Sequence, residues 1–280
     1  MSDVADRAQT LTAQRRPFVH ATVVRAQEPT SARPGDAAVI LDDGTIEGFV
    51  GGVCAESSVR AAALETLRDG RTLLLRVLPE SAEEFPEAPG AQVVVNPCLS
   101  GGAIEIFLRP VLPRPVLGIA GTTPIGTAVA ELARFLEFDV SGDMAGATAV
   151  VVAGLGRDEE TSIRAALDAG VDYIALVASP RRGPQVLDGM GLTSAERARI
   201  HTPAGAWIGA RTPPEIALSI MSDIVKAIRL DGLSATPFEK PAAATDPICG
   251  MTVLITPDAL TDGDGHYFCG PGCLARFTGA

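Results

Sequence analysis

The segment that most constrains the fold is PVLGIAGTTPIGTAVAELARFLEF, residues 115 to 138. An apolar β-run leads through a glycine turn into an amphipathic helix that begins near Pro124. Strand and helix patterns then alternate through ATAVVVAGLG, DEETSIRAALDAG and VDYIALVAS. Because strands that alternate with helices form parallel sheets, residues 113–230 predict a shortened Rossmann-like, doubly wound domain of the α/β class.

The dinucleotide-binding fingerprint of this domain is incomplete. Gly121 and Gly126 occupy the first and third positions of G-x-G-x-x-G, but Thr123 stands at the second. That glycine lets the backbone approach a pyrophosphate, so its replacement argues against NAD(P) binding, although helix N-terminal amides could still hold an anionic group. Three basic residues are candidate contacts for phosphate or pterin groups, with solvated surface charges as the alternative: Arg181, Arg182 and Arg211.

Residues 17–112 predict an α+β domain. PFVHATVVRA reads as a strand, DAAVILDDGTIEGFVGG as a hairpin, and CAESSVRAAALETLRDG as a helix that stops at Gly70. RTLLLRVL and AQVVVNPCLSGGAIEIFLRPV supply further β-runs. Residues 1–16 are polar and lack a sustained apolar period, so we expect a flexible arm or a frayed helix.

Two loops of this domain each pair glycines with a cysteine, in GGVC (51–54) and CLSGG (98–102). Glycines permit positive φ and a close ligand approach, and the dipole of a following helix favours the thiolate form of Cys54. The alternative is that the glycines only form turns and that Cys54 and Cys98 are small buried hydrophobes. The sequence leaves open whether the two loops meet.

The C-terminal part contains a different cysteine pattern. LDGLSATPFEKPAAAT is rich in alanine, proline and small polar residues, so residues 231–245 read as a linker. In residues 246–280, Cys249 is followed after nineteen residues by Cys269-x-x-x-Cys273. Three thiolates are the ligands that Zn(II) or Cu(I) selects, and His266 is a further candidate ligand. In so small a module, metal could supply much of the folding free energy.

Composition excludes several classes of protein. The chain of 280 residues has five cysteines and a formal net charge of −11 at pH 7. The odd cysteine count argues against a secreted disulfide framework, and the acidity argues against a nucleic-acid partner. No apolar run reaches the roughly 18–20 residues needed to span a bilayer, so we expect a cytoplasmic protein without a membrane span.

VGGVCAE, CLSGGAIEIFLRP and IGARTPPEIALSI, in this order, resemble the signature segments of the XdhC/CoxI family over residues 17–230. The resemblance, to CoxF-like members, implies a non-catalytic accessory protein for molybdenum hydroxylases such as xanthine dehydrogenase and aerobic carbon-monoxide dehydrogenase. Such a factor binds molybdenum cofactor, supports its sulfuration with a desulfurase, inserts it into the apoenzyme and forms homodimers. The matching cofactor-site residues are Gly51, Gly52, Cys54, Glu56, Cys98, Ser100, Gly101, Gly102 and Arg211.

Residues 246–280 are similar to the YHS domain, a short metal-associated module. If the enzyme served is carbon-monoxide dehydrogenase, whose site carries copper beside molybdenum, the resemblance implies copper handling by the three cysteines. Two other functions stay open. A hydride-transferring NAD(P)-linked oxidoreductase would need cofactor binding despite Thr123, and a metal- or thiol-sensing regulator would bind a partner in a metal-dependent way without any pterin.

Overall fold

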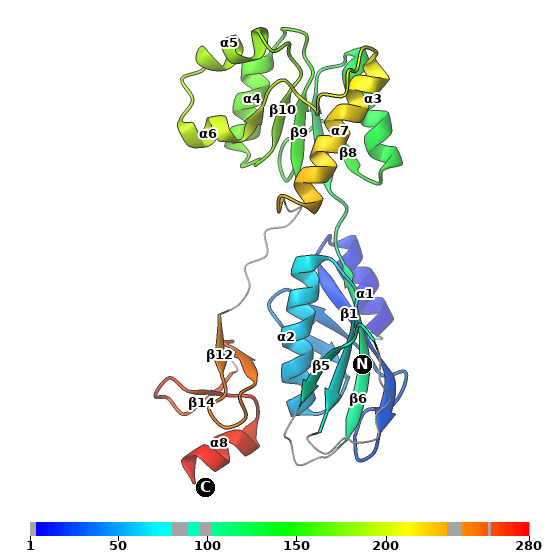
Figure 1. The fold of residues 1–280 in the computed structure, drawn as a ribbon, viewed down its shortest axis with the longest axis vertical. Coiled ribbons are helices and arrows are strands. Elements are labelled where there is room, and N and C mark those ends of the chain that lie inside the picture. Colours follow the sequence, from blue (N-terminus) through cyan, green and yellow to red (C-terminus); the bar gives the residue numbers. More distant parts are fainter. Residues whose placement is uncertain (1–3, 80–88, 96–101, 234–241, 257–258, 280) are drawn as a thin grey trace. The chain divides into compact units, whose positions relative to one another are not determined.

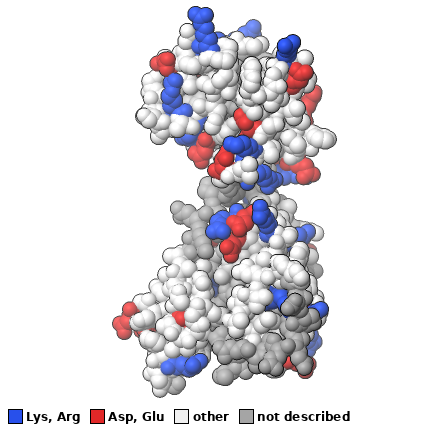
Figure 2. Space-filling view, in the orientation of Figure 1, with Lys and Arg blue, Asp and Glu red and all other residues white. Residues whose placement is uncertain are grey.

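The computed structural model describes residues 4–79, 89–95, 102–233, 242–256 and 259–279, except for the side chains of residues 53 and 54. The chain forms two compact units (Figure 1). The first contains Met1–Pro113 together with Phe238–Ala280, and the second contains Arg114–Pro237. No helix among the described residues is both long and apolar enough to cross a membrane. On the face of each unit shown in Figure 2, basic and acidic side chains are interspersed.

The first unit is built on a six-stranded sheet with the order β3-β2-β1-β6-β4-β5. Neighbouring strands are antiparallel except for β4 and β5, which are parallel. The strands are β1 (Phe18–Gln27), β2 (Ala37–Leu41), β3 (Ile46–Gly48), β4 (Leu73–Leu78), β5 (Gln92–Val95) and β6 (Ala103–Val111). The predicted hairpin, strands and α+β class of this domain are therefore confirmed.

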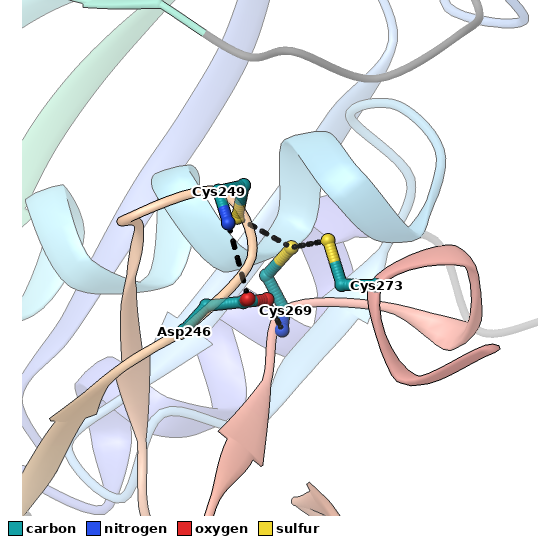
Figure 3. A group of neighbouring side chains, drawn as sticks. All are labelled: Asp246, Cys249, Cys269 and Cys273. Atoms are coloured by element: carbon teal, nitrogen blue, oxygen red, sulfur yellow. Dashed lines mark hydrogen bonds between the residues drawn. The ribbon is translucent and has the colours of Figure 1, made fainter. Parts of the chain in front are cut away.

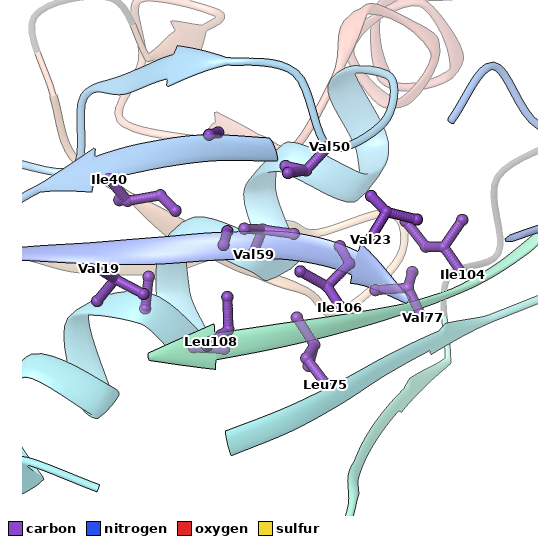
Figure 4. Packing of buried hydrophobic residues seen from close by; sticks show 14 of the residues in the cluster. Val19, Val23, Ile40, Val50, Val59, Leu75, Val77, Ile104, Ile106 and Leu108 are labelled. Carbon is purple, nitrogen blue, oxygen red and sulfur yellow. The ribbon is translucent and has the colours of Figure 1, made fainter. Parts of the chain in front are cut away.

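Helix α2 (Val53–Asp69) covers one face of this sheet. Alternate residues of β1 and β6, such as Val19 and Ile106, point toward the helix and pack with Val59 and other buried apolar side chains (Figure 4). The helix ends where predicted, because Gly70 has φ 64° and its N–H donates to the Thr66 carbonyl oxygen.

The opposite face of the sheet carries α1 (Val4–Ala13). Leu11 is fully buried and packs with Phe18, the neighbour of Val19 on β1, so the two side chains lie on opposite faces. Arg7 adds a salt bridge to Glu47 at 2.6 Å. Residues 4–13 thus form a packed helix where the sequence predicted a flexible arm or a frayed helix.

The second unit is a parallel five-stranded sheet with the order β11-β10-β9-β7-β8. Its strands are β7 (Val116–Ala120), β8 (Asp139–Ser141), β9 (Ala149–Val152), β10 (Ile174–Leu176) and β11 (Ile200–His201). Its helices are α3 (Pro124–Phe135), α4 (Glu159–Asp168), α5 (Arg182–Asp188), α6 (Ser194–Ala198) and α7 (Pro213–Arg229). Helices α3 and α7 pack on one face and α4 on the other, which confirms the Rossmann-like fold.

The C-terminal segment belongs to the first unit and contains short elements. These are β12 (Ala243–Thr245), β13 (Thr252–Leu254), β14 (Leu260–Thr261), β15 (Tyr267–Phe268) and α8 (Pro271–Thr278). Strand β12 lies inside the predicted linker, where it pairs with β13. The expected division into an arm, three domains and a linker stays a prediction.

Candidate metal centre

Asp246, Cys249, Cys269 and Cys273 form a cluster of possible metal ligands. The first half of this cluster is a turn that follows β12. Asp246 is 1% exposed, and its Oδ1 accepts hydrogen bonds from the N–H groups of Ile248 (2.8 Å) and Cys249 (3.3 Å). The Gly250 N–H donates to the Asp246 carbonyl oxygen, and the φ of 74° at Gly250 suits a residue without a side chain. This turn holds Cys249 half-buried beside the carboxylate.

The second half joins β15 to α8. Cys269 follows β15 directly, and Cys273 is the third residue of α8, whose N-cap is Gly270. The Cys269 N–H donates to Asp246 Oδ2 at 2.8 Å. One carboxylate therefore accepts backbone hydrogen bonds from both halves of the site and connects them.

The three sulfur atoms lie close together (Figure 3). Cys249 Sγ is 3.4 Å from Cys269 Sγ, which is 3.7 Å from Cys273 Sγ. These separations exceed a disulfide bond of about 2.05 Å and approach the ~3.8 Å between two sulfurs bound tetrahedrally at ~2.3 Å from zinc. The ligand atoms of Asp246 and the three cysteines all lie within 4.8 Å of one another. Three soft thiolates and a carboxylate fit Zn(II), and the thiolates also fit Cu(I).

The electrostatics of the cluster suit a cation. Burial raises the pKa of the Cys269 and Cys273 thiols, the latter to about 11. Burial would also raise the pKa of Asp246, but the N–H groups of Cys269 and Ile248 outweigh it and lower this pKa to about 2. The site thus holds an ionised carboxylate beside thiols that a bound metal would deprotonate.

Asp246 is the member of the cluster that the cysteine spacing did not reveal. The available signal was an aspartate three residues before a cysteine and next to a proline, a pattern typical of a side-chain-stabilised turn. His266 is not in the cluster. Its ring lies 2.7 Å from Asp262 Oδ2 and packs 5.0 Å from the ring of Phe277.

The predicted cofactor loop at α2 is described in part. Gly51 is buried with φ 136°, a conformation that requires glycine, and Gly52 is the N-cap of α2. Glu56 lies in the first turn and is half-buried. Cys54 is in the same turn, with its side chain outside the described atoms.

In the second predicted loop, Cys98, Ser100 and Gly101 lie outside the described residues. Gly102, directly before β6, is described, and a Cβ there would collide with the Pro29 carbonyl oxygen.

The glycine turn of the second unit has a structural explanation. Thr123 is the N-cap of α3, and its Oγ1 accepts a hydrogen bond from the Gly126 N–H at 3.2 Å. Gly121 has φ 102°, and a Cβ there would collide with the Ala153 carbonyl oxygen. Thr123 therefore satisfies an amide that a phosphate would otherwise use.

Among the predicted arginines, Arg182 forms a paired salt bridge with Glu159, which is 4% exposed, at 2.8 and 2.6 Å. Arg181 and Arg211 are exposed.

Comparisons with known proteins agree with this architecture. The model of the XdhC and CoxI family matches residues 11–77, and the model of the XdhC Rossmann domain matches residues 117–224. The protein named "Uncharacterized protein YqeB" from Escherichia coli strain K12 is 25% identical over 259 residues. The aligned part is 80% of this chain but 46% of that protein, so the chain spans less than half of this relative's length.

A solved structure described as a xanthine dehydrogenase from Bacillus halodurans is 16% identical, with a TM-score of 0.39. The aligned part covers 85% of this chain and 99% of the Bacillus halodurans chain. The two family models match more than half of the chain between them, and each match falls on a fold of the expected kind. The chain therefore belongs to the XdhC and CoxI family.

Proposed function

We propose that this chain is a maturation factor that binds molybdenum cofactor and assists its sulfuration and insertion into a molybdenum hydroxylase. The observation that carries the proposal is the presence of both family domains in one chain. Proteins of this family are accessory factors for molybdenum hydroxylases. The enzyme served would be of the xanthine dehydrogenase or carbon-monoxide dehydrogenase type, and the factor itself would not be a catalyst.

The cofactor would bind at the start of α2. Gly51 and Gly52 keep side chains away from the backbone there, and the N-cap Gly52 makes no side-chain cap hydrogen bond, so the positive end of the α2 dipole would face an anionic pterin phosphate. Cys54 would supply a soft thiolate to molybdenum or carry sulfur. Cys98, Ser100, Gly101 and Gly102 would complete this site. In the second unit, taken by itself, the exposed Arg181 and Arg211 would be candidate contacts for a phosphate group.

The C-terminal cluster would hold one Zn(II) or Cu(I) ion through Cys249, Cys269, Cys273 and Asp246. A bound ion would supply a structural cross-link between the two halves of a segment with a small core. A short segment that binds a metal in this way would resemble the YHS domain. The partners of the whole protein would be a desulfurase, an apo-hydroxylase and a second copy of this chain, in the cytoplasm.

The proposal is tested by purifying the chain from a host that makes molybdenum cofactor. Molybdenum, zinc and copper are measured by elemental analysis, and pterin is measured by its fluorescence. We expect near-stoichiometric pterin and molybdenum in wild type and loss of both in Cys54→Ala. Glu65→Gln, at an exposed position of the same helix, is the matched control and should keep both pterin and molybdenum. Metal without pterin in the wild-type chain would contradict the proposal and favour a metal-sensing regulator. Hydride transfer from NAD(P)H would favour an oxidoreductase.

A further inference from the structure

The C-terminal segment is packed into the first unit through helix α2. Leu254 on β13 is 4% exposed and belongs to the apolar core between α2 and the six-stranded sheet. Ser58 on α2 is 7% exposed, and its Oγ donates to the sulfur of Met251 at 3.7 Å. Strand β13 therefore supplies Leu254 to the core around α2, from which it is far separated in sequence.

Met251 connects this interface to the cysteine cluster. Its side chain, 8% exposed, belongs to a small apolar cluster with Val253 and Cys269, against which Cys249 and Cys273 pack. The same side chain contacts Ser58. The side chain of Met251 thus contacts both α2 and the cluster that contains the cysteine ligands, and Figure 3 shows α2 beside the four ligands.

The secondary structure of the segment, where the structure describes it, is short. Its strands β12 to β15 contain only two or three residues each, and β12-β13 and β14-β15 form separate two-stranded sheets. Isolated two-stranded sheets are marginally stable in water. A metal bound by Asp246, Cys249, Cys269 and Cys273 would connect β12, β15 and α8, so much of the segment's folding free energy would depend on it.

We propose that the metal-loaded C-terminal segment is a cover for α2, and that removal of the metal detaches this cover and loosens the helix. Detachment withdraws Leu254 from the core and leaves Ser58 and its neighbours on α2 exposed to water. The second turn of α2 contains Ser58, and the glycine–cysteine loop of residues 51–54 leads into its first turn. Metal occupancy would then regulate the loop assigned to molybdenum cofactor, and this last step alone rests on the proposed function.

The test is hydrogen–deuterium exchange of the full chain, with Zn(II) bound and after treatment with a chelator. We expect the α2 amides from Ser58 to Thr66 to exchange at least tenfold faster after zinc removal. Helix α7 in the second unit is the internal control and should not change. If α2 keeps its protection while residues 246–256 and 259–279 exchange faster, the metal stabilises the segment without controlling the helix, and the proposal is overturned.

Two variants separate metal binding from docking. Leu254→Ala, in the zinc-loaded chain, should speed exchange in α2 while one zinc per chain is retained. Val253→Ala, the neighbouring truncation on the metal-cluster side of β13, is the matched control and should leave α2 more protected than Leu254→Ala does. Equal protection of α2 in wild type and Leu254→Ala would show that packing of Leu254 does not stabilise α2, and would overturn the proposal. Neither the exchange of α2 nor the zinc content depends on pterin, so both measurements test this proposal even if the chain does not bind molybdenum cofactor.

Discussion

Asp246→Asn should loosen the metal-free C-terminal segment measurably. The carboxylate accepts three backbone hydrogen bonds, and the substituted amide would place an NH₂ group against at least one of the donors. The pKa of Asp246 falls from 3.8 to about 2 in the folded chain. At 1.36 kcal/mol per pKa unit, the ionised carboxylate contributes about 2 kcal/mol to the stability of the folded segment. Loss of this contribution corresponds to a roughly thirty-fold decrease in exchange protection.

The assay is the exchange of the Cys269 amide, which donates to Asp246 Oδ2, in the chelator-treated chain at pH 7. Asp264→Asn is the matched control, because Asp264 is an exposed carboxylate in the same segment. The stability difference between wild type and Asp246→Asn should be full above about pH 5 and shrink as pH falls from 4 toward 2, because protonation then removes the wild-type charge. Equal protection in Asp246→Asn and Asp264→Asn at pH 7 would refute the reasoning.

Three further changes test the packing of both units. Leu11→Ala should destabilise the first unit by about 2–4 kcal/mol in urea unfolding, because Leu11 is fully buried; a loss below 1 kcal/mol would restore the flexible-arm interpretation. Thr123→Ala should lower the stability of the second unit by about 1 kcal/mol through loss of the cap on Gly126, and unchanged urea unfolding would show that the cap is unimportant. Glu159→Gln should cost about 1–2 kcal/mol at neutral pH by breaking the bond to Arg182. Because Arg182 and the Gly156 N–H outweigh burial and lower the pKa of Glu159, that difference should shrink below about pH 4.5; a pH-independent difference would contradict this assignment.

The sequence predicted the elements whose signals are local. The period of α2, its stop at Gly70 and the hairpin of β2 and β3 depend on neighbouring residues, and the structure confirms them. The short runs at α1 and β12 carry no such signal. Helix α1 is ordered by packing of Leu11 with residues far along the chain, such as Val39 and Val111, and β12 by its pairing with β13.

The cysteine spacing predicted three members of the candidate site, which the structure brings together. Asp246 could not be derived from spacing, because its role depends on accepting the N–H of Cys269, 23 residues away. The packing of Leu254 against α2 was equally hidden, since an apolar residue in a short strand is typical of a small module's own core. Arg182 read as a candidate phosphate contact and Thr123 as an obstacle to a pyrophosphate, and the structure assigns both local structural partners.

The central structural claim is a metal centre built from three thiolates and one carboxylate. X-ray absorption at the zinc edge of the zinc-loaded chain tests it most directly. We predict one zinc per chain with three sulfur ligands at about 2.3 Å and one oxygen ligand at about 2.0–2.2 Å, the oxygen being lost or replaced in Asp246→Asn. A shell of nitrogen and oxygen alone, or a histidine pattern that disappears in His266→Ala, would contradict the account.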